Sequence, residues 1–239
     1  MEVKKSLPIP HLNRLKKNSI PMPDFYSQYY REYHQRTFKA DMSSVLLLLA
    51  KHLPPGSHIL DVGCGSGRDL LWFKKRGFEA TGFERSPQLA ALARQHAGCE
   101  VIEGDFEQYD FSRLSYSAVI MMGSLVHTAH ENFEEVFKRI VPGVKKTGYV
   151  LISLKQGTGR RADSYNRVFY LWQDETLRKI FSDNSFNIVE HSRQVSKLCT
   201  DEIWLAYVLS VPGDKSPGCF QMSLPEREFG DSCGLAETL

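Results

Sequence analysis

Three glycines spaced two residues apart follow a short apolar run that ends in an acid. The segment HILDVGCGSGRD covers residues 58–69 and contains Asp61, Gly63, Gly65 and Gly67. A tight turn from a strand into a helix needs positive φ angles, or a backbone with no side chain in the way. Such a turn lets a ligand approach the main chain, but glycines also occupy turns that bind nothing, so the purely structural interpretation stays open.

A second acid, Glu84, ends the next apolar run, ATGFE, 21 residues after Gly63. In doubly wound α/β sheets, an acid at the end of the second strand accepts hydrogen bonds from ribose hydroxyls. A solvated glutamate at a strand end would be the default interpretation if the glycine turn were absent. The two features together indicate a site for a ligand that contains a nucleoside.

The charge and spacing at the turn narrow the choice of ligand. Asp61 would repel the pyrophosphate of a dinucleotide, and the usual spacing G-x-G-x-x-G is missing. The G-K-[ST] of a P-loop is also missing. S-adenosylmethionine has no phosphate, and its ammonium group suits a carboxylate. The residues favour this cofactor; an NAD(P)-dependent oxidoreductase and a non-catalytic cofactor-binding protein remain the alternatives.

Four motifs, DVGCGSG, FERSP, EGDF and MMGSLVH, resemble in order those of class I S-adenosylmethionine-dependent methyltransferases. The resemblance covers roughly residues 25–211. YHQRTFKADMS, SLKQGTG and TDEIWL also resemble a bacterial subgroup of small methyltransferases whose substrates are mostly unassigned. The resemblance implies an enzyme that transfers a methyl group to a small-molecule acceptor and releases S-adenosylhomocysteine.

The resemblance also implies which residues hold the cofactor. Asp61 and the glycine turn would surround the methionine part, Glu84 would hold the ribose, and Asp105 would accept from the adenine amino group. Tyr33 and Thr37, in the aromatic segment 25–38, would close over the cofactor. The full implied set is Tyr33, Thr37, Asp61, Gly63, Cys64, Gly65, Glu84, Arg85, Gly104, Asp105, Phe106, Met122 and Gly123, with no particular contact assigned to Arg85.

His127 is the candidate catalytic base. Methyl transfer from a sulfonium is an in-line displacement, so an enzyme chiefly aligns the acceptor with the methyl group and excludes water. A hydroxyl or ammonium acceptor must also lose a proton, which a histidine can accept near neutral pH. A structural histidine is an equally good interpretation. His127 and His130 lack a third metal ligand nearby, so no metal is predicted; Ser124 either lines the methyl channel or caps the loop.

The segment KQGTGRRADSYNR, residues 155–167, follows the fifth predicted strand and would cover the acceptor. Its glycines and its basic residues favour a mobile lid or an anionic acceptor, although a plain solvated loop is the commoner meaning of such a sequence. Four residues in and after the segment are candidates for the wall of the acceptor pocket: Lys155, Arg160, Arg161 and Tyr170.

Composition sets the broad class. The chain has 239 residues, 42% hydrophobic and 24% charged, with a formal net charge of +2, which predicts a globular protein without a strong field for nucleic acid or membrane. Aromatic residues between 25 and 38 are an alternative stacking platform for nucleic acid, but the low net charge favours a small-molecule acceptor. The longest apolar run of the chain, 45–50, is too short to span a bilayer.

The five cysteines form no C-x-x-C pair, which favours a cytoplasmic location.

The elements that position these residues alternate between strand and helix. Apolar runs at 58–62, 78–83, 99–102, 117–122 and 148–154 have strand lengths, and stretches with helical spacing separate them. This pattern predicts an α/β, doubly wound, Rossmann-like sheet with helices on both faces. The resemblance adds that the sheet has seven strands, mostly parallel, with the last strand antiparallel.

Boundary signals and segment composition complete the predicted organisation. Asp41, Ser86 and Asp174 are the expected N-caps of three helices, and the runs FNIVEH and EIWLAYVLSV are expected to pair antiparallel. The prediction divides the chain into a basic flexible arm at 1–24, the methyltransferase domain at 25–211 and an irregular extension at 212–239. The sequence makes no prediction of the oligomeric state.

Overall fold

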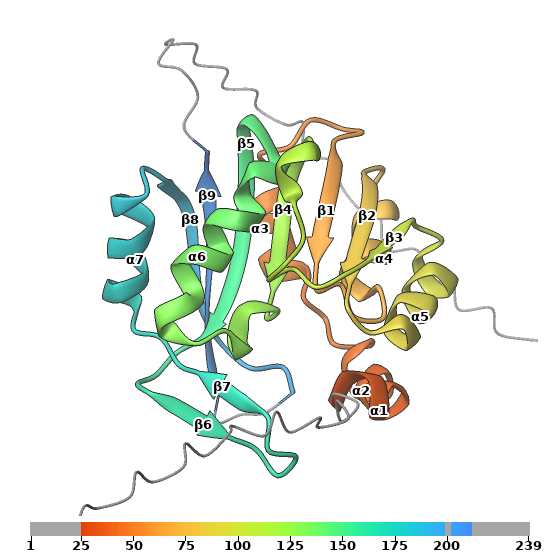
Figure 1. The fold of residues 1–239 in the computed structure, drawn as a ribbon. Helices are drawn as coiled ribbons and strands as arrows, with labels where there is room; N and C mark the ends of the chain where they lie inside the picture. The colour runs from red at the N-terminus through yellow and green to blue at the C-terminus, as the bar shows by residue number, and fades with distance from the viewer. Residues whose placement is uncertain (1–24, 199–201, 212–239) are drawn as a thin grey trace, which may run out of the picture.

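The computed structural model describes residues 25–198 and 202–211. Its centre is a seven-stranded sheet with the strand order β3-β2-β1-β4-β5-β9-β8 (Figure 1). The strands are β1 (His58–Val62), β2 (Glu79–Glu84), β3 (Val101–Glu103), β4 (Tyr116–Met122), β5 (Val144–Lys155), β8 (Asn187–Val195) and β9 (Ile203–Ser210). The chain's last strand, β9, runs antiparallel to both of its neighbours, β5 and β8, whereas the pairs formed by β1 to β5 are parallel.

The predicted fold class is therefore confirmed. The expected arm at 1–24 and extension at 212–239 lie outside the described residues. Among the described residues, no helix has the length and apolarity needed to cross a membrane.

Helices cover both faces of the sheet (Figure 1). α3 and α4 pack against the sheet on one face, and α6 and α7 pack on the other face. Three short 3-10 turns, η1 to η3, complete the connections. The helical elements are α1 (Phe25–Gln28), α2 (Tyr30–Thr37), α3 (Ser43–Ala50), α4 (Arg68–Lys74), α5 (Pro87–Ala97), α6 (His130–Ile140), α7 (Asp174–Asp183), η1 (Phe111–Arg113), η2 (Leu125–His127) and η3 (Val141–Gly143).

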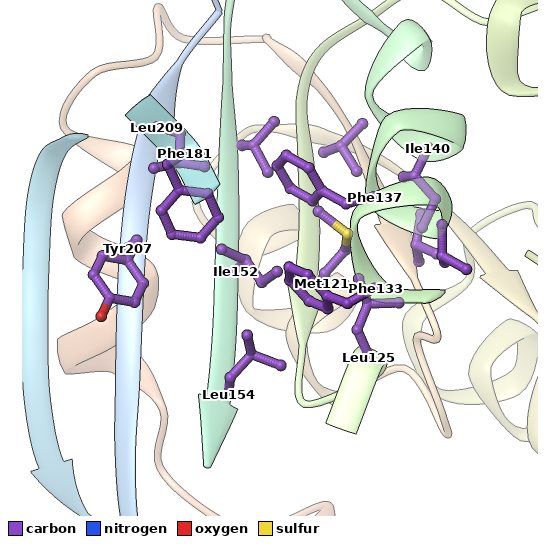
Figure 2. Packing of buried hydrophobic residues seen from close by; sticks show 14 of the residues in the cluster. Met121, Leu125, Phe133, Phe137, Ile140, Ile152, Leu154, Phe181, Tyr207 and Leu209 are labelled. Atoms are coloured by element: carbon purple, nitrogen blue, oxygen red, sulfur yellow. The ribbon is translucent and has the colours of Figure 1, made fainter. Parts of the chain in front are cut away.

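The larger core lies between α6, α7 and the sheet. The helical spacing of Phe133, Val136, Phe137 and Ile140 predicts one buried face, and all four are buried. Figure 2 shows Phe133 and Phe137 pointing from α6 toward Met121 and Ile152 of the sheet, with Phe181 of α7 and Tyr207 beyond them. This packing fixes β4 and β5, whose carboxyl ends carry candidate site residues.

Of the three predicted helix N-caps, the structure confirms one. Ser86 caps α5, since its Oγ accepts a hydrogen bond from the Leu89 amide at 3.4 Å. The predictions for Asp41 and Asp174 were wrong. Met42 and Gln173 occupy the two N-cap positions without a side-chain cap. Asp41 accepts from the Ser43 amide just outside the helix, and Asp174 lies inside the first turn of α7, where it binds Arg178 and Tyr207.

Replacing Ser86 by alanine should lower the free energy of unfolding by about 1 kcal/mol, because the first turn of α5 loses its capping oxygen. The Ser86 Oγ also lies 3.3 Å from the Tyr26 carbonyl oxygen, so the variant loosens α1 as well. Chemical denaturation measures the change. Ser86→Gly is the control, since glycine at an N-cap costs only a few tenths of a kcal/mol; equal stability of Ser86→Ala and the wild type would contradict the assignment.

One hairpin was not predicted. β6 (Arg160–Ala162) pairs antiparallel with β7 (Val168–Tyr170) in a separate two-stranded sheet. The sequence predicted a lid or loop here, because each strand has only three residues and those of β6 are exposed and mostly charged. In Figure 1 this hairpin and helices α1 and α2 lie at the end of the sheet toward which β1, β4 and β5 point.

Candidate active site

The glycine turn joins β1 to α4 with a backbone that other residues cannot adopt without strain. Gly63 and Gly67 have φ angles of +76° and +86°. A Cβ on Gly63 would lie 2.5 Å from the Ser124 Cβ, and a Cβ on Gly67 would lie 2.9 Å from the Ala93 Cα. The glycines therefore have a structural reason to be present. The same turn presents a bare backbone at the carboxyl edge of the sheet.

Glu84 fastens this turn to the end of β2. Its carboxylate is buried and accepts from the Gly65 amide and from the Ser86 amide, each at 2.9 Å. Burial raises the pKa of Glu84, and these backbone hydrogen bonds oppose the rise. Each carboxylate oxygen has two acceptor sites, so Glu84 keeps capacity for two further donors such as ribose hydroxyls.

Asp61 lies in β1, two residues before Gly63, and one of its carboxylate oxygens lacks a donor. It is 2% exposed, and its Oδ2 has no hydrogen-bond partner. Burial raises the pKa of Asp61 well above its usual range, and the nearby charge of Asp69 adds to this rise. The charge of Arg68 opposes part of this rise, but its guanidinium binds both oxygens of Asp69 at 2.7 and 2.8 Å and leaves the Asp61 Oδ2 without a donor. A buried carboxylate oxygen without a partner is costly, and a ligand ammonium would supply the missing donor.

The residues expected to contact the adenine lie in the loop after β3. Gly104 donates its amide to the Glu84 carbonyl at 3.1 Å, and a Cβ on Gly104 would lie 2.9 Å from the Phe83 ring. The Asp105 Oδ1 accepts from the Glu107 amide at 2.9 Å, and its Oδ2 lies 3.9 Å from Arg85. Arg85 thus stands beside Asp105 rather than beside the glycine turn. A further predicted residue, Phe106, is half-buried against the core.

Cys64 contributes to the turn through backbone hydrogen bonds, a thiol that donates to the Gly65 carbonyl, and packing. Its amide donates to the Phe83 carbonyl, and its carbonyl accepts from the Gly67 amide. Its side chain is buried in the cluster that holds Leu70 and Ala93, next to the space where a Gly82 side chain would be. The structure therefore leaves Cys64 no free hydrogen-bond donor to offer a ligand.

Helix α2 brings Tyr33 and Thr37 onto the turn. The Tyr33 ring lies 3.4 Å from the position of a Cβ on Gly65, so the ring covers the glycine backbone. The Thr37 hydroxyl donates to the Tyr33 carbonyl at 2.7 Å. These two residues, with Met122 and Gly123 at the end of β4, line a cavity of about 360 Å³, within the range of small-ligand pockets.

The cavity continues past β4 to the hairpin and to the start of β9. Lys155 and Arg161 line it, as the sequence predicted, but Arg160 and Tyr170 do not. The hairpin register explains the difference. Arg160 pairs with Tyr170 and Arg161 pairs with Phe169, and successive residues of a strand point to opposite faces. Arg160 and Tyr170 therefore share the face that points away from the cavity.

Several lining residues were not assigned from the sequence: Tyr26, Asp163, Arg167, Phe169, Glu202 and Trp204. They come from α1, the hairpin and the start of β9, elements far apart in the chain. Only tertiary packing brings them together. The one available signal was the density of aromatic and basic residues in residues 25–38 and 155–170.

His127 contacts Tyr26 rather than the cavity. Its Nδ1 lies 2.6 Å from the Val168 carbonyl oxygen, which can only accept, so Nδ1 carries the proton. The Nε2 of the neutral ring is then an acceptor, and it receives the Tyr26 hydroxyl at 2.7 Å. Burial lowers the pKa of His127, which keeps the ring neutral. Tyr26 lines the cavity, while His127 lies behind it.

The other two candidates of this loop have different surroundings. Ser124 makes no side-chain cap, and its Oγ is buried without a partner against Gly63. His130 is directed at the Leu171 carbonyl at 2.9 Å, so it does not converge with His127. Among the residues that the structure describes, no group of three or more His, Cys, Asp or Glu side chains is arranged to hold a metal ion.

The neutral state of His127 has a consequence for stability at low pH. Folding lowers the pKa of His127 from 6.5. As the pH falls below about 6.5, His127 therefore binds a proton in the unfolded chain but stays neutral in the folded chain. Stability should fall between about pH 7 and pH 5, by at most about 1.4 kcal/mol per pH unit from this residue. In His127→Gln, whose amide still accepts from Tyr26, denaturation curves should show a shallower loss; an equal loss would contradict the assignment.

Comparison with known proteins agrees with this architecture. Residues 59–148 match a family described as a methyltransferase domain. An aminosugar enzyme of Streptomyces fradiae, dTDP-3-amino-3,6-dideoxy-alpha-D-glucopyranose N,N-dimethyltransferase, is 26% identical over 124 residues, which are 51% of this chain and 47% of the relative. The chain spans about half the length of the curated relatives it matches.

Solved structures have the same fold. One is 1,6-didemethyltoxoflavin-N1-methyltransferase from Burkholderia thailandensis with bound S-adenosylhomocysteine, at a TM-score of 0.63 and 20% identity over 79% of this chain and 84% of that one. Another is magnesium protoporphyrin IX methyltransferase from Synechocystis PCC 6803 with bound SAM, at a TM-score of 0.57 and 20% identity over 79% and 85%.

The strand order, the antiparallel β9 and the glycine turn define the class I methyltransferase fold. The family match over residues 59–148 and the solved structures agree with this fold.

Proposed function

We propose that this protein transfers the methyl group of S-adenosylmethionine to a small-molecule acceptor and releases S-adenosylhomocysteine. The observation that carries the proposal is the pair of buried carboxylates at the glycine turn. Asp61 keeps an unpartnered oxygen, and Glu84 keeps free acceptor sites on oxygens already held by backbone amides. A ligand with an ammonium group and two ribose hydroxyls satisfies both, whereas a pyrophosphate offers these oxygens no hydrogen-bond donor.

Each group of predicted residues would bind a different part of the cofactor. Asp61 would hold the ammonium, Glu84 the ribose, and the loop of Gly104, Asp105 and Phe106 the adenine. Tyr33, Thr37, Met122 and Gly123 line the cavity where the methyl group would be presented. Cys64 serves as a packing residue of the turn, and Arg85 orients Asp105. When bound, S-adenosylmethionine supplies an activated methyl group on sulfur.

A proton-bearing acceptor would lose its proton through Tyr26. S-adenosylmethionine would supply the methyl group from its sulfonium and would leave as a neutral thioether. The acceptor's proton moves to the Tyr26 oxygen while the Tyr26 hydroxyl proton moves to the Nε2 of His127, so the step ends with a neutral tyrosine and a protonated His127. The 2.7 Å contact between these two residues supports this route.

Tyr26→Phe should therefore lower the turnover of a hydroxyl or amine acceptor about a hundredfold, since it removes the relay to His127. Affinity for S-adenosylhomocysteine should change little. Mass spectrometry of methylated products from a panel of phenols and amines measures turnover. Tyr165→Phe is the matched control, because Tyr165 also lines the cavity and has no contact with His127. Undiminished turnover in Tyr26→Phe would remove the relay.

Thermal unfolding of the purified protein with S-adenosylhomocysteine, NADH or NADPH tests the choice of cofactor. A ligand at 100 times its dissociation constant adds about 2.7 kcal/mol of stability. The proposal expects a rise in melting temperature with S-adenosylhomocysteine alone. A rise only with a nicotinamide cofactor would support an oxidoreductase, and tight cofactor binding without any methylated product would support the non-catalytic alternative.

The proposed domain comprises residues 25–211, the partner is a small molecule rather than nucleic acid, and the proposed location is the cytoplasm. Among the described residues, Cys64 and Cys99 are buried free thiols, which suits a reducing compartment.

A further inference from the structure

Basic side chains outnumber acidic side chains on the walls of the cavity. The acidic lining residues are Asp163 and Glu202. A hollow lined mainly by one sign of charge concentrates ligands of the opposite sign. The basic lining residues are Arg36, Arg68, Lys155, Arg161, Arg167 and Lys197.

The ion pairs leave part of this charge uncompensated. Arg167 binds Asp163 at 2.6 Å. The Glu202 Oε1 accepts from the Lys155 ammonium at 2.7 Å and also from the Arg161 guanidinium. One carboxylate oxygen thus serves two cations. Within the described part of the chain, this cluster of Lys155, Arg161 and Glu202 carries one net positive charge.

Burial makes this excess charge significant. Lys155 is 7% exposed, and its ammonium lies 3.9 Å from the centre of the Phe169 ring and 5.4 Å from that of Trp204. Burial lowers the pKa of Lys155, as do the charges of Arg161 and Arg167, while Glu202 raises it. The cations are therefore close enough to repel one another, and an anion placed between them would be stabilised.

An ammonium acceptor suits these walls less well, although they contain acids and aromatic rings. The cavity's carboxylates already bind cations of the protein itself. Two of the ring faces that line the cavity also have a cation of the protein beside them, since Lys155 lies over Phe169 and Arg167 lies 5.7 Å from the centre of Tyr26. A positively charged ligand would have to displace these groups.

We propose that the acceptor carries a carboxylate or phosphate group, which binds beside Lys155 and Arg161 while the body of the molecule packs against the rings of Tyr165 and Trp204. This inference rests on the proposed function, because it names the substrate class of the same site. Glu202 then acts as a positioning residue that holds both cations at the cavity wall.

Small probes that differ in charge test the inference. Calorimetry on the protein saturated with S-adenosylhomocysteine compares benzoate and phenyl phosphate with the neutral benzamide and the cationic benzylamine. At least one anion should bind about tenfold or more tightly than benzamide, the effect of one charge-assisted hydrogen bond or more. Preference between benzoate and phenyl phosphate identifies the anionic group. Tighter binding of benzylamine, or equal binding of benzamide and both anions, would overturn the inference.

Two variants locate the site. Arg161→Gln and Lys155→Met should each reduce the preference for the anion to less than about threefold. Arg160→Gln removes the same charge from the neighbouring position, which faces away from the cavity, and should keep the preference. An anion preference that survives in both cavity variants would overturn the inference.

The test separates the two levels of the proposal. S-adenosylhomocysteine binding by each variant shows that it is folded. If S-adenosylhomocysteine fails to bind the wild type, the proposed function fails, and the same probes titrated into the free protein still measure the anion preference. If S-adenosylhomocysteine binds and no anion is preferred, only the inference fails.

Discussion

Glu84→Ala should weaken the binding of S-adenosylhomocysteine by about 3 to 6 kcal/mol, because two charge-assisted hydrogen bonds to ribose hydroxyls are worth about 1.5 to 3 kcal/mol each. The carboxylate also holds the Gly65 and Ser86 amides, so its loss frees the turn as well. Calorimetric titration gives the change in affinity directly.

Glu84→Gln is the matched control for this prediction. The amide keeps one oxygen acceptor and the size of the side chain but loses the charge. Its affinity for S-adenosylhomocysteine should therefore lie between that of the wild type and that of Glu84→Ala. Unfolding curves of both variants separate a loosened turn from lost ligand contacts. Unchanged affinity in Glu84→Ala would place the ribose elsewhere.

Gly63→Ala should lower the free energy of unfolding by about 2 to 5 kcal/mol. The φ of +76° costs an alanine about 1 to 2 kcal/mol, and the new methyl group would lie 2.5 Å from the Ser124 Cβ, an overlap worth about 1 to 3 kcal/mol more. Chemical denaturation measures the loss.

Gly56→Ala separates the two contributions. Gly56 has a φ of +75°, and a Cβ there would meet nothing within 4 Å, so this variant carries the backbone strain without the overlap. It should lose only about 1 to 2 kcal/mol. Equal losses in Gly56→Ala and Gly63→Ala would show that the Ser124 loop moves aside freely, and that the turn is less rigid than the structure indicates.

The sequence predicted the sheet well because its signals are local. Residues 58–62 read as a strand and form β1, and the spacing of Phe133, Val136, Phe137 and Ile140 predicted the buried face of α6. The positions of Asp61 and Glu84 followed from the strand ends. A parallel sheet brings such ends to one edge, so residues distant in sequence meet there without any further information.

The acceptor side could be predicted only in part, because it depends on how separate elements pack. Lys155 and Arg161 were expected at the pocket, but which hairpin residues face it follows from the pairing of β6 with β7. His127 was a candidate base, yet the sequence could not show that Tyr26, 101 residues earlier in the chain, stands between it and the cavity. The predicted N-caps at Asp41 and Asp174 were wrong because each carboxylate binds another nearby group. Asp41 accepts from the Ser43 amide, and Asp174 accepts from the Arg178 guanidinium.

Calorimetric titration of S-adenosylhomocysteine into the wild-type protein and into Glu84→Ala tests the central claim most directly. We expect one binding site per chain in the wild type and a loss of affinity of about 3 kcal/mol or more in the variant, with no binding of NADH or NADPH. Absence of S-adenosylhomocysteine binding in a folded wild-type protein, or binding of a nicotinamide cofactor in its place, would contradict the account.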